Sequence, residues 1–167
     1  AEGGVISGEQ FVDECQVESD LELLLPATYV TGSSERMLLY RELDSLTLDK
    51  DVEAFRNRLI DRFGPVPSET EELLRIVPLR RLAARLGAEK VFLKGGRMSL
   101  FFISNPESPY YQSQAFGKVI AYMMKYTRRC DLREQNTRRS MLVKDVKNVE
   151  TAVGVLQEIV AMQVEEG

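Results

Sequence analysis

The chain has 167 residues, of which 44% are hydrophobic, and it carries a net charge of −4 with no histidine. This size and apolar content suffice for one hydrophobic core without disulfides or structural metal. Only Cys15 and Cys130 are present, without Cys-x-x-Cys spacing, so a zinc site of the usual Cys and His type is excluded. No apolar run is long enough to cross a bilayer, and no secretion signal is visible. We therefore expect a cytoplasmic protein that needs no cofactor.

The N-terminal end differs in composition from the rest of the chain. Because residues 1–13 are rich in glycine and acidic side chains, we expect a linker there and a single domain over residues 14–167. From Glu14 to Leu25 apolar side chains occupy nearly every second position. That is the period of a strand with one buried face. The sequence thus predicts one long strand that ends at Pro26.

Two amphipathic helices are predicted next. The first covers residues 33–46, and a serine at position 33 or 34 is its expected cap. The second covers residues 49–63, begins with Asp49 as its cap, and has an apolar stripe at helical spacing, made of Val52, Phe55, Leu59, Ile60 and Phe63. Its opposite side is a small mixed-charge face with no evident structural role, formed by Ala54, Asn57, Arg58 and Asp61.

A glycine and a proline at positions 64–65 stop the second helix, since glycine tolerates positive φ and proline cannot continue a helix. A third helix restarts shortly afterwards, where Ser68 and Glu71 have the spacing of a capping box. Pro78 is expected to kink or split this third helix, because an interior proline removes one helical hydrogen bond. Gly87 supplies the next stop.

The second half of the sequence predicts mostly strands. Gly95–Gly96 separates two apolar segments at residues 91–94 and 97–103, which is typical of a tight antiparallel hairpin. The remaining expected elements are a helix opening at Ser108, short strands at residues 130–134 and 138–143, and a helix capped by Asn148. The expected fold class is α+β, with about five helices and a small mixed or antiparallel sheet that includes the Gly-Gly hairpin.

No pattern for catalysis is visible. Gly95–Gly96 is followed by Arg97 and Met98 rather than by the Lys and Ser or Thr of a phosphate-binding loop. Histidine, the usual base for a nucleophile, is absent. The acidic group at residues 69–72 lies in the first turns of a helix, where negative charge stabilises the helix dipole. We expect no catalytic residue and no ATP site.

Charge is distributed unevenly along the chain. Residues 1–25 contain seven acidic side chains and no basic one, whereas residues 118–147 contain nine bases against three acids. This basic band could contact nucleic-acid phosphates, or it could dock on an acidic partner or remain solvated. Because the chain is acidic overall and has no nucleic-acid-binding motif, we favour docking or solvation. The candidate basic surface consists of Arg128, Arg129, Arg138 and Arg139.

Four ordered segments resemble the C-terminal domain of bacterial transcription-repair coupling factors. They are residues 20–30 (Asp-Leu-Glu-Leu-Leu-Leu-Pro-Ala-Thr-Tyr-Val), residues 35–43, residues 59–67 and residues 79–87. The third contains Asp-Arg-Phe-Gly and coincides with the predicted helix stop. The resemblance extends from about residue 14 to about residue 160, and after residue 92 it concerns the order of elements more than motifs.

The resemblance implies a regulatory domain without enzymatic activity. The parent would be an ATP-dependent DNA translocase, acting with RNA polymerase, UvrA and DNA and not with membranes. In that family this domain packs on an N-terminal module that resembles UvrB and masks the UvrA-recruiting surface. The helix that precedes Asp-Arg-Phe-Gly contributes to the contact, so Ala54, Asn57, Arg58 and Asp61 are the expected partner-binding residues. The alternative is an independent nucleic-acid-binding module that uses the basic band.

Overall fold

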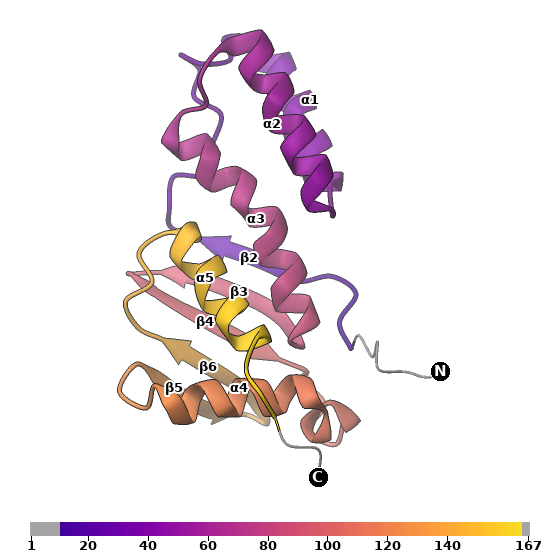
Figure 1. Cartoon of the computed structure of the whole chain (residues 1–167), viewed down its shortest axis with the longest axis vertical. Helices are drawn as coiled ribbons and strands as arrows, with labels where there is room; N and C mark the ends of the chain where they lie inside the picture. The colour runs from indigo at the N-terminus through magenta and orange to yellow at the C-terminus, as the bar shows by residue number, and fades with distance from the viewer. Residues whose placement is uncertain (1–10, 165–167) are drawn as a thin grey trace.

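The computed structural model describes residues 11–164, in which helices and strands are interspersed (Figure 1). The strands are β2 (Gln16–Ser19), β3 (Ala88–Lys94), β4 (Arg97–Phe102), β5 (Cys130–Gln135) and β6 (Arg138–Val143). The helices are α1 (Ser33–Ser45), α2 (Asp49–Phe63), α3 (Ser68–Arg85), α4 (Gln114–Lys125) and α5 (Val149–Val160), with the short 3-10 helix η1 (Pro109–Gln112) before α4. The predicted α+β class is therefore confirmed.

The strands form one mixed sheet in the order β2-β3-β4-β6-β5. β2 runs parallel to β3, and the other neighbours are antiparallel. Gly95 and Gly96 join β3 to β4 with φ angles of 63° and 74°, the positive values that a two-residue hairpin turn requires. The predicted Gly-Gly hairpin is confirmed. Figure 1 shows α3, α4 and α5 on one side of this sheet.

The first strand is much shorter than predicted, because β2 contains only four residues. After it the chain leaves the sheet: Leu25 N–H donates to the Tyr40 hydroxyl at 2.7 Å, and the Leu24 carbonyl accepts from Thr70 Oγ1 at 2.8 Å. Leu23 packs against the core beside the sheet, whereas Leu25 is buried among the first helices. The alternation in the sequence thus reflects apolar side chains that serve two different cores rather than one continuous strand.

Buried side chains gather in two clusters that α3 connects. The sheet core lies between the strands and α3, α4 and α5, and it includes Leu79 and Leu82 of α3. The helical core lies between α1, α2 and the first half of α3, and its buried members are Leu25, Val30, Leu43, Phe55, Leu59, Leu74 and Val77. Pro78 lies where α3 passes from one core to the other, and the helix continues through it, so the predicted split does not occur.

Several predicted helix starts are corrected. Gly32, Leu48 and Pro67 occupy the N-cap positions of α1, α2 and α3, and none of the three makes a side-chain cap bond. The Ser68–Glu71 capping box is absent because the Glu71 carboxylate binds Arg56 instead. The helix expected at Ser108 begins as η1, and α4 starts only after a second cap at Ser113.

Two other expectations concern the chain's ends. Asn148 caps α5 as predicted, with its Oδ1 accepting from Thr151 N–H at 2.7 Å. Residues 1–10 of the expected linker lie outside the described residues. Val12 is buried in the sheet core, and the Phe11 ring packs edge-on against Tyr110 with ring centroids 5.5 Å apart. Core packing therefore begins before residue 14.

Candidate docking face on helix α2

The corner after α2 is held by a tyrosine from the loop between β2 and α1. Tyr29 donates its hydroxyl to the Gly64 carbonyl at 2.8 Å, and its ring packs against Phe63 with centroids 5.7 Å apart. Gly64 has φ 90° and ψ −166°, a positive φ that favours glycine but lies outside the left-handed helical region. The predicted helix stop is confirmed, and Tyr29 gives the end of α2 a defined position.

The two sides of α2 differ as their spacing predicts. Phe55 and Leu59 are each 1% exposed in the helical core, and Val52 and Phe63 pack half-buried against it. The outward face is exposed at every one of its four predicted positions, Ala54, Asn57, Arg58 and Asp61. We call these four residues the α2 face. The structure brings them together on one surface.

The two charged members of the α2 face differ in their surroundings. Arg58 donates from Nη2 to a carboxylate oxygen of Glu42 in α1, and its guanidinium stands 5.5 Å from the centre of the Phe55 ring. The hydrogen bond to Glu42 raises the pKa of Arg58. Asp61 is exposed and has no ion-pair partner within residues 11–164. Asp61 is therefore the free charge of this face.

A second ion pair fixes α1 against α2. Arg62 of α2 donates to the Glu35 carboxylate of α1, and its guanidinium lies 4.9 Å from the centre of the Phe63 ring. Together with Arg58–Glu42, it links the two helices at two separate places along their length. The α2 face is thus presented by a braced helix pair rather than by one isolated helix.

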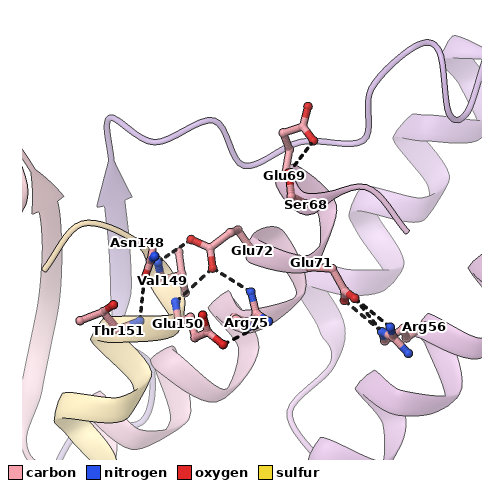
Figure 2. A network of polar contacts seen from close by, with 10 residues as sticks. All are labelled: Arg56, Ser68, Glu69, Glu71, Glu72, Arg75, Asn148, Val149, Glu150 and Thr151. Atoms are coloured by element: carbon pink, nitrogen blue, oxygen red, sulfur yellow. Dashed lines mark hydrogen bonds and ion pairs between the residues drawn. The ribbon is translucent and has the colours of Figure 1, made fainter. Parts of the chain in front are cut away.

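Helix α3 carries two adjacent acidic residues that point in different directions, and only the first of them contacts the helix pair (Figure 2). Glu71 turns toward α2, where Arg56 Nε donates to its Oε1 at 2.9 Å and Arg56 Nη2 to its Oε2 at 2.8 Å. These hydrogen bonds hold the pKa of the Glu71 carboxyl below its usual value. The two-point geometry matches the guanidinium fork to the carboxylate and fixes the rotation of α2 on α3.

Glu72 turns toward the sheet side of the molecule and meets the start of α5 (Figure 2). Its carboxylate accepts from Val149 N–H at 2.6 Å and from Glu150 N–H at 3.1 Å, and Arg75 Nη1 donates to it at 2.9 Å. A carboxylate at a helix N-terminus satisfies free N–H groups and stabilises the helix dipole. Glu72 therefore couples α3 to α5. Nothing in the sequence beyond two consecutive acids signals this partner.

The structure divides the predicted basic surface. Arg128 and Arg129 precede β5, whereas Arg138 and Arg139 begin β6, at the opposite end of the β5–β6 hairpin. Three of these arginines have partners within the chain: Arg129 donates to the carbonyls of Lys144 and Asp145, Arg138 pairs with Glu89, and Arg139 pairs with Glu134. The four arginines therefore do not form one continuous patch.

Neither cysteine has the environment of a reactive thiol. Cys15 and Cys130 are both buried, and burial raises the pKa of Cys15 to about 12 and also raises the pKa of Cys130. Residues 11–164 contain no group of three or more metal-ligating side chains. Within the same part of the chain, no helix has the length and apolar character needed to cross a membrane.

The family model of the TRCF domain matches residues 19–113, more than half of the chain. The chain belongs to the TRCF domain family. The match runs from the end of β2 through η1, so the α2 face and the Tyr29 corner of this TRCF domain lie inside it. α4, β5, β6 and α5 lie beyond the matched residues.

Proteins of similar sequence include transcription-repair-coupling factors of several bacteria. The transcription-repair-coupling factor of Rickettsia bellii (strain RML369-C) is 30% identical over 132 residues, which cover 78% of this chain and 11% of that protein. That of Staphylococcus haemolyticus (strain JCSC1435) is 25% identical over 131 residues, covering 75% of this chain and 11% of that protein. The chain thus spans about a tenth of these relatives. The solved C-terminal domain of a transcription-repair coupling factor superposes with a TM-score of 0.66 at 17% identity, covering 88% of this chain and 93% of that chain, which shows the shared fold.

Proposed function

We propose that this TRCF domain is a non-catalytic regulatory domain of a transcription-repair coupling factor that docks through the α2 face on the UvrB-like N-terminal module of its parent. The observation that carries the proposal is the free carboxylate of Asp61 on a helix whose neighbouring charged side chains are engaged within the domain. An exposed face on a braced helix, with one charge that has no ion-pair partner among the described residues, suits specific docking, because little ordering is needed on binding.

Docking would regulate the parent by favouring one of two states. In the closed state the TRCF domain covers the UvrA-recruiting surface of the N-terminal module, and in the open state that surface and the motor are released. RNA polymerase, DNA or ATP would shift the balance by binding the two states with different affinity. The parent's activity as an ATP-dependent DNA translocase would reside outside this chain, which would neither bind nor hydrolyse ATP.

The alternative, an independent nucleic-acid module built on the basic band, receives less support. Arg129, Arg138 and Arg139 each have partners inside the chain, and the two arginine pairs stand at opposite ends of a hairpin. A polyanion would have to displace these partners before it could engage all four side chains. Docking through the α2 face needs no such rearrangement.

A charge reversal tests the docking proposal. Asp61→Lys should weaken binding of the TRCF domain to the isolated N-terminal module by at least about tenfold, because an interfacial charge loses its partner. The same change in the full-length parent should raise UvrA binding. Glu107→Lys is a matched control, because Glu107 is an exposed acid in the loop between β4 and η1. A parent with Asp61→Lys that binds UvrA no better than the control would remove the α2 face from the proposed contact.

A further inference from the structure

One face of the sheet is covered by none of the helices in residues 11–164. Side chains alternate along strands, so Val91, Leu93 and Leu100, which are fully or almost fully buried against α3, α4 and α5, define the covered face. The positions between them face the other way, and the described helices lie on the covered face or in the helical core. We call this second surface the open sheet face.

Two aromatic rings occupy the middle of the open sheet face. Phe92 of β3 and Phe101 of β4 are neighbours across the strand pair, with ring centroids 5.8 Å apart and planes at 73°. Both rings are only half-buried, and neither belongs to the sheet core or packs against it. Sheet faces that serve only as a solvated surface place polar side chains at such central positions. A pair of accessible phenylalanines therefore indicates a surface that binds something.

Basic side chains surround the two rings. Lys90 Nζ stands 4.5 Å from the centre of the Phe92 ring, and the Arg138 guanidinium stands 5.7 Å from that of Phe101. Each of these bases is paired with an acid, Lys90 with Glu18 at 3.2 Å and Arg138 with Glu89 at 3.1 Å. The centre of the face is thus locally neutral. The bases without an acidic partner among residues 11–164 lie at its margin, where the Asp20 carboxylate also accepts from Gly95 N–H at 2.9 Å.

The margin at the Gly-Gly hairpin has three bases without an ion-pair partner in the described part of the chain. Lys94 and Arg97 are cross-strand partners on either side of the turn, and both are exposed. Lys144 is also exposed, and it lies near Arg97 at the same margin. The residues beside them, Val143 of β6 and Met98 of β4, are cross-strand partners. Accessible rings with unpaired cations at one margin are complementary to a chain that offers flat π surfaces and negative charge.

We propose that the open sheet face binds single-stranded nucleic acid, with bases stacked on Phe92 and Phe101 and phosphates directed toward Lys94, Arg97 and Lys144. Bases in a duplex are stacked on each other, so only a single strand can present them to a flat sheet. Every base can stack on an aromatic ring, and every nucleotide carries the same phosphate, so the binding should not depend on sequence. The surface differs from the arginine surface considered above, with which it shares only Arg138.

Direct binding is tested with the whole chain and fluorescent oligonucleotides of roughly ten nucleotides, one arm oligothymidylate and the other oligouridylate. Fluorescence anisotropy should show saturable binding at low salt in at least one arm, and duplex DNA of the same length should compete poorly. With three phosphates neutralised, log affinity should fall against log salt with a slope of about −2. Absence of saturable binding in both arms would overturn the proposal.

Matched variants separate stacking from simple attraction of charge. Phe92→Leu and Phe101→Leu keep an apolar side chain but remove the ring, and each should weaken binding by about fivefold or more, whereas Phe92→Tyr should not. Lys94→Glu should weaken binding and flatten the salt slope. Lys50→Glu, at an exposed position of α2, is the control and should change neither. If the leucine variants bound the oligonucleotides as tightly as the unmutated chain does, the stacking model would be overturned.

A direct reporter is available because the chain contains no tryptophan. Phe92→Trp places a single indole on the open sheet face, and its fluorescence should be quenched as a base stacks on it. An oligonucleotide that binds Phe92→Trp without changing its emission would contradict contact at this face. Because residues of the α2 face are untouched, these variants should still bind the N-terminal module, so this proposal and the docking proposal can fail separately.

Discussion

Arg56 of α2 and Glu71 of α3 form a two-point ion pair, Nε to Oε1 at 2.9 Å and Nη2 to Oε2 at 2.8 Å. The pair lies beside the helical core and joins the helix that carries the α2 face to the helix that spans both cores. Glu72, the next residue, binds the start of α5 (Figure 2). Two adjacent carboxylates on α3 therefore link α2 to the sheet side of the molecule.

Replacing Glu71 by glutamine should destabilise the domain modestly. The glutamine side chain keeps the shape of the glutamate but carries no charge, and the partners are about a third exposed, so we expect a loss of about 1 kcal/mol in the free energy of unfolding at neutral pH. Urea denaturation of the unmutated chain and of the Glu71→Gln variant measures the difference in the free energy of unfolding.

The same pair predicts a pH dependence with a definite sign. Arg56 lowers the pKa of Glu71 in the folded state, so its stabilisation is fully present above the unfolded value of about 4.3 and is lost as the pH falls through the lower folded value. The difference in the free energy of unfolding between the unmutated chain and Glu71→Gln should therefore shrink as the pH falls below about 4. A gap of the same size at acidic and neutral pH would show that charge is not its cause.

Glu72→Ala should lower the stability of the domain more than truncation of Glu69, an acid in the preceding turn of the same helix. Glu72 accepts from two N–H groups of α5 and from Arg75. Among residues 11–164, the Glu69 carboxylate accepts a hydrogen bond only from the hydroxyl of Ser68, its neighbour in the same helix turn. Loss of the carboxylate leaves N–H groups at the start of α5 without this acceptor, and we expect about 1–2 kcal/mol. Glu69→Ala should change stability by less than about 0.5 kcal/mol. Thermal unfolding of both variants compares them directly, and equal losses would refute a capping role for Glu72.

The helices of the α2 region were predictable because their signals are local. The stripe containing Phe55 and Leu59 repeats at helical spacing, and Gly64 with Pro65 ends it. The role of Glu71 was not predictable, because its partner Arg56 lies 15 residues away, across a helix packing that the sequence does not specify. A local capping box with Ser68 was the available interpretation, and the long-range ion pair replaced it.

The open sheet face illustrates a second limit. Alternation around Phe92 and Phe101 predicts strands, but it does not say which face the helices cover. That depends on how α3, α4 and α5 pack, which assigns Val91 and Leu100 to the core and leaves the two phenylalanines outside it. The same ambiguity made residues 14–25 look like one strand, although the apolar side chains of Leu23 and Leu25 belong to different cores.

Mutations on the two sides of α2 should change the free energy of unfolding by very different amounts. Phe55 is 1% exposed in the helical core, so Phe55→Ala should lower the free energy of unfolding by about 3–5 kcal/mol through lost contacts and a residual cavity. Asp61 is exposed and has no ion-pair partner among the described residues, so Asp61→Lys should change the free energy of unfolding by less than about 0.5 kcal/mol. Urea denaturation measures both. A large loss for Asp61→Lys would mean that its effect on docking could not be separated from folding.

Gly87→Ala should be among the most damaging single-methyl additions in the chain. Gly87 has φ +85°, and a Cβ there would lie 2.1 Å from Cε1 of Tyr110, a fully buried ring whose hydroxyl donates to the Leu86 carbonyl. Backbone strain and overpacking act together, so we expect a loss of at least about 3 kcal/mol in the free energy of unfolding.

Gly64→Ala separates the two causes. Gly64 also has positive φ, at +90°, but a Cβ there would meet no atom within 4 Å. Only the conformational cost remains, and the expected loss is about 1–3 kcal/mol. Chemical denaturation of the two alanine variants should therefore rank Gly87→Ala as the less stable. If Gly64→Ala were equally destabilised, the contact with Tyr110 would not be what requires glycine at position 87, and the backbone conformation alone would account for both.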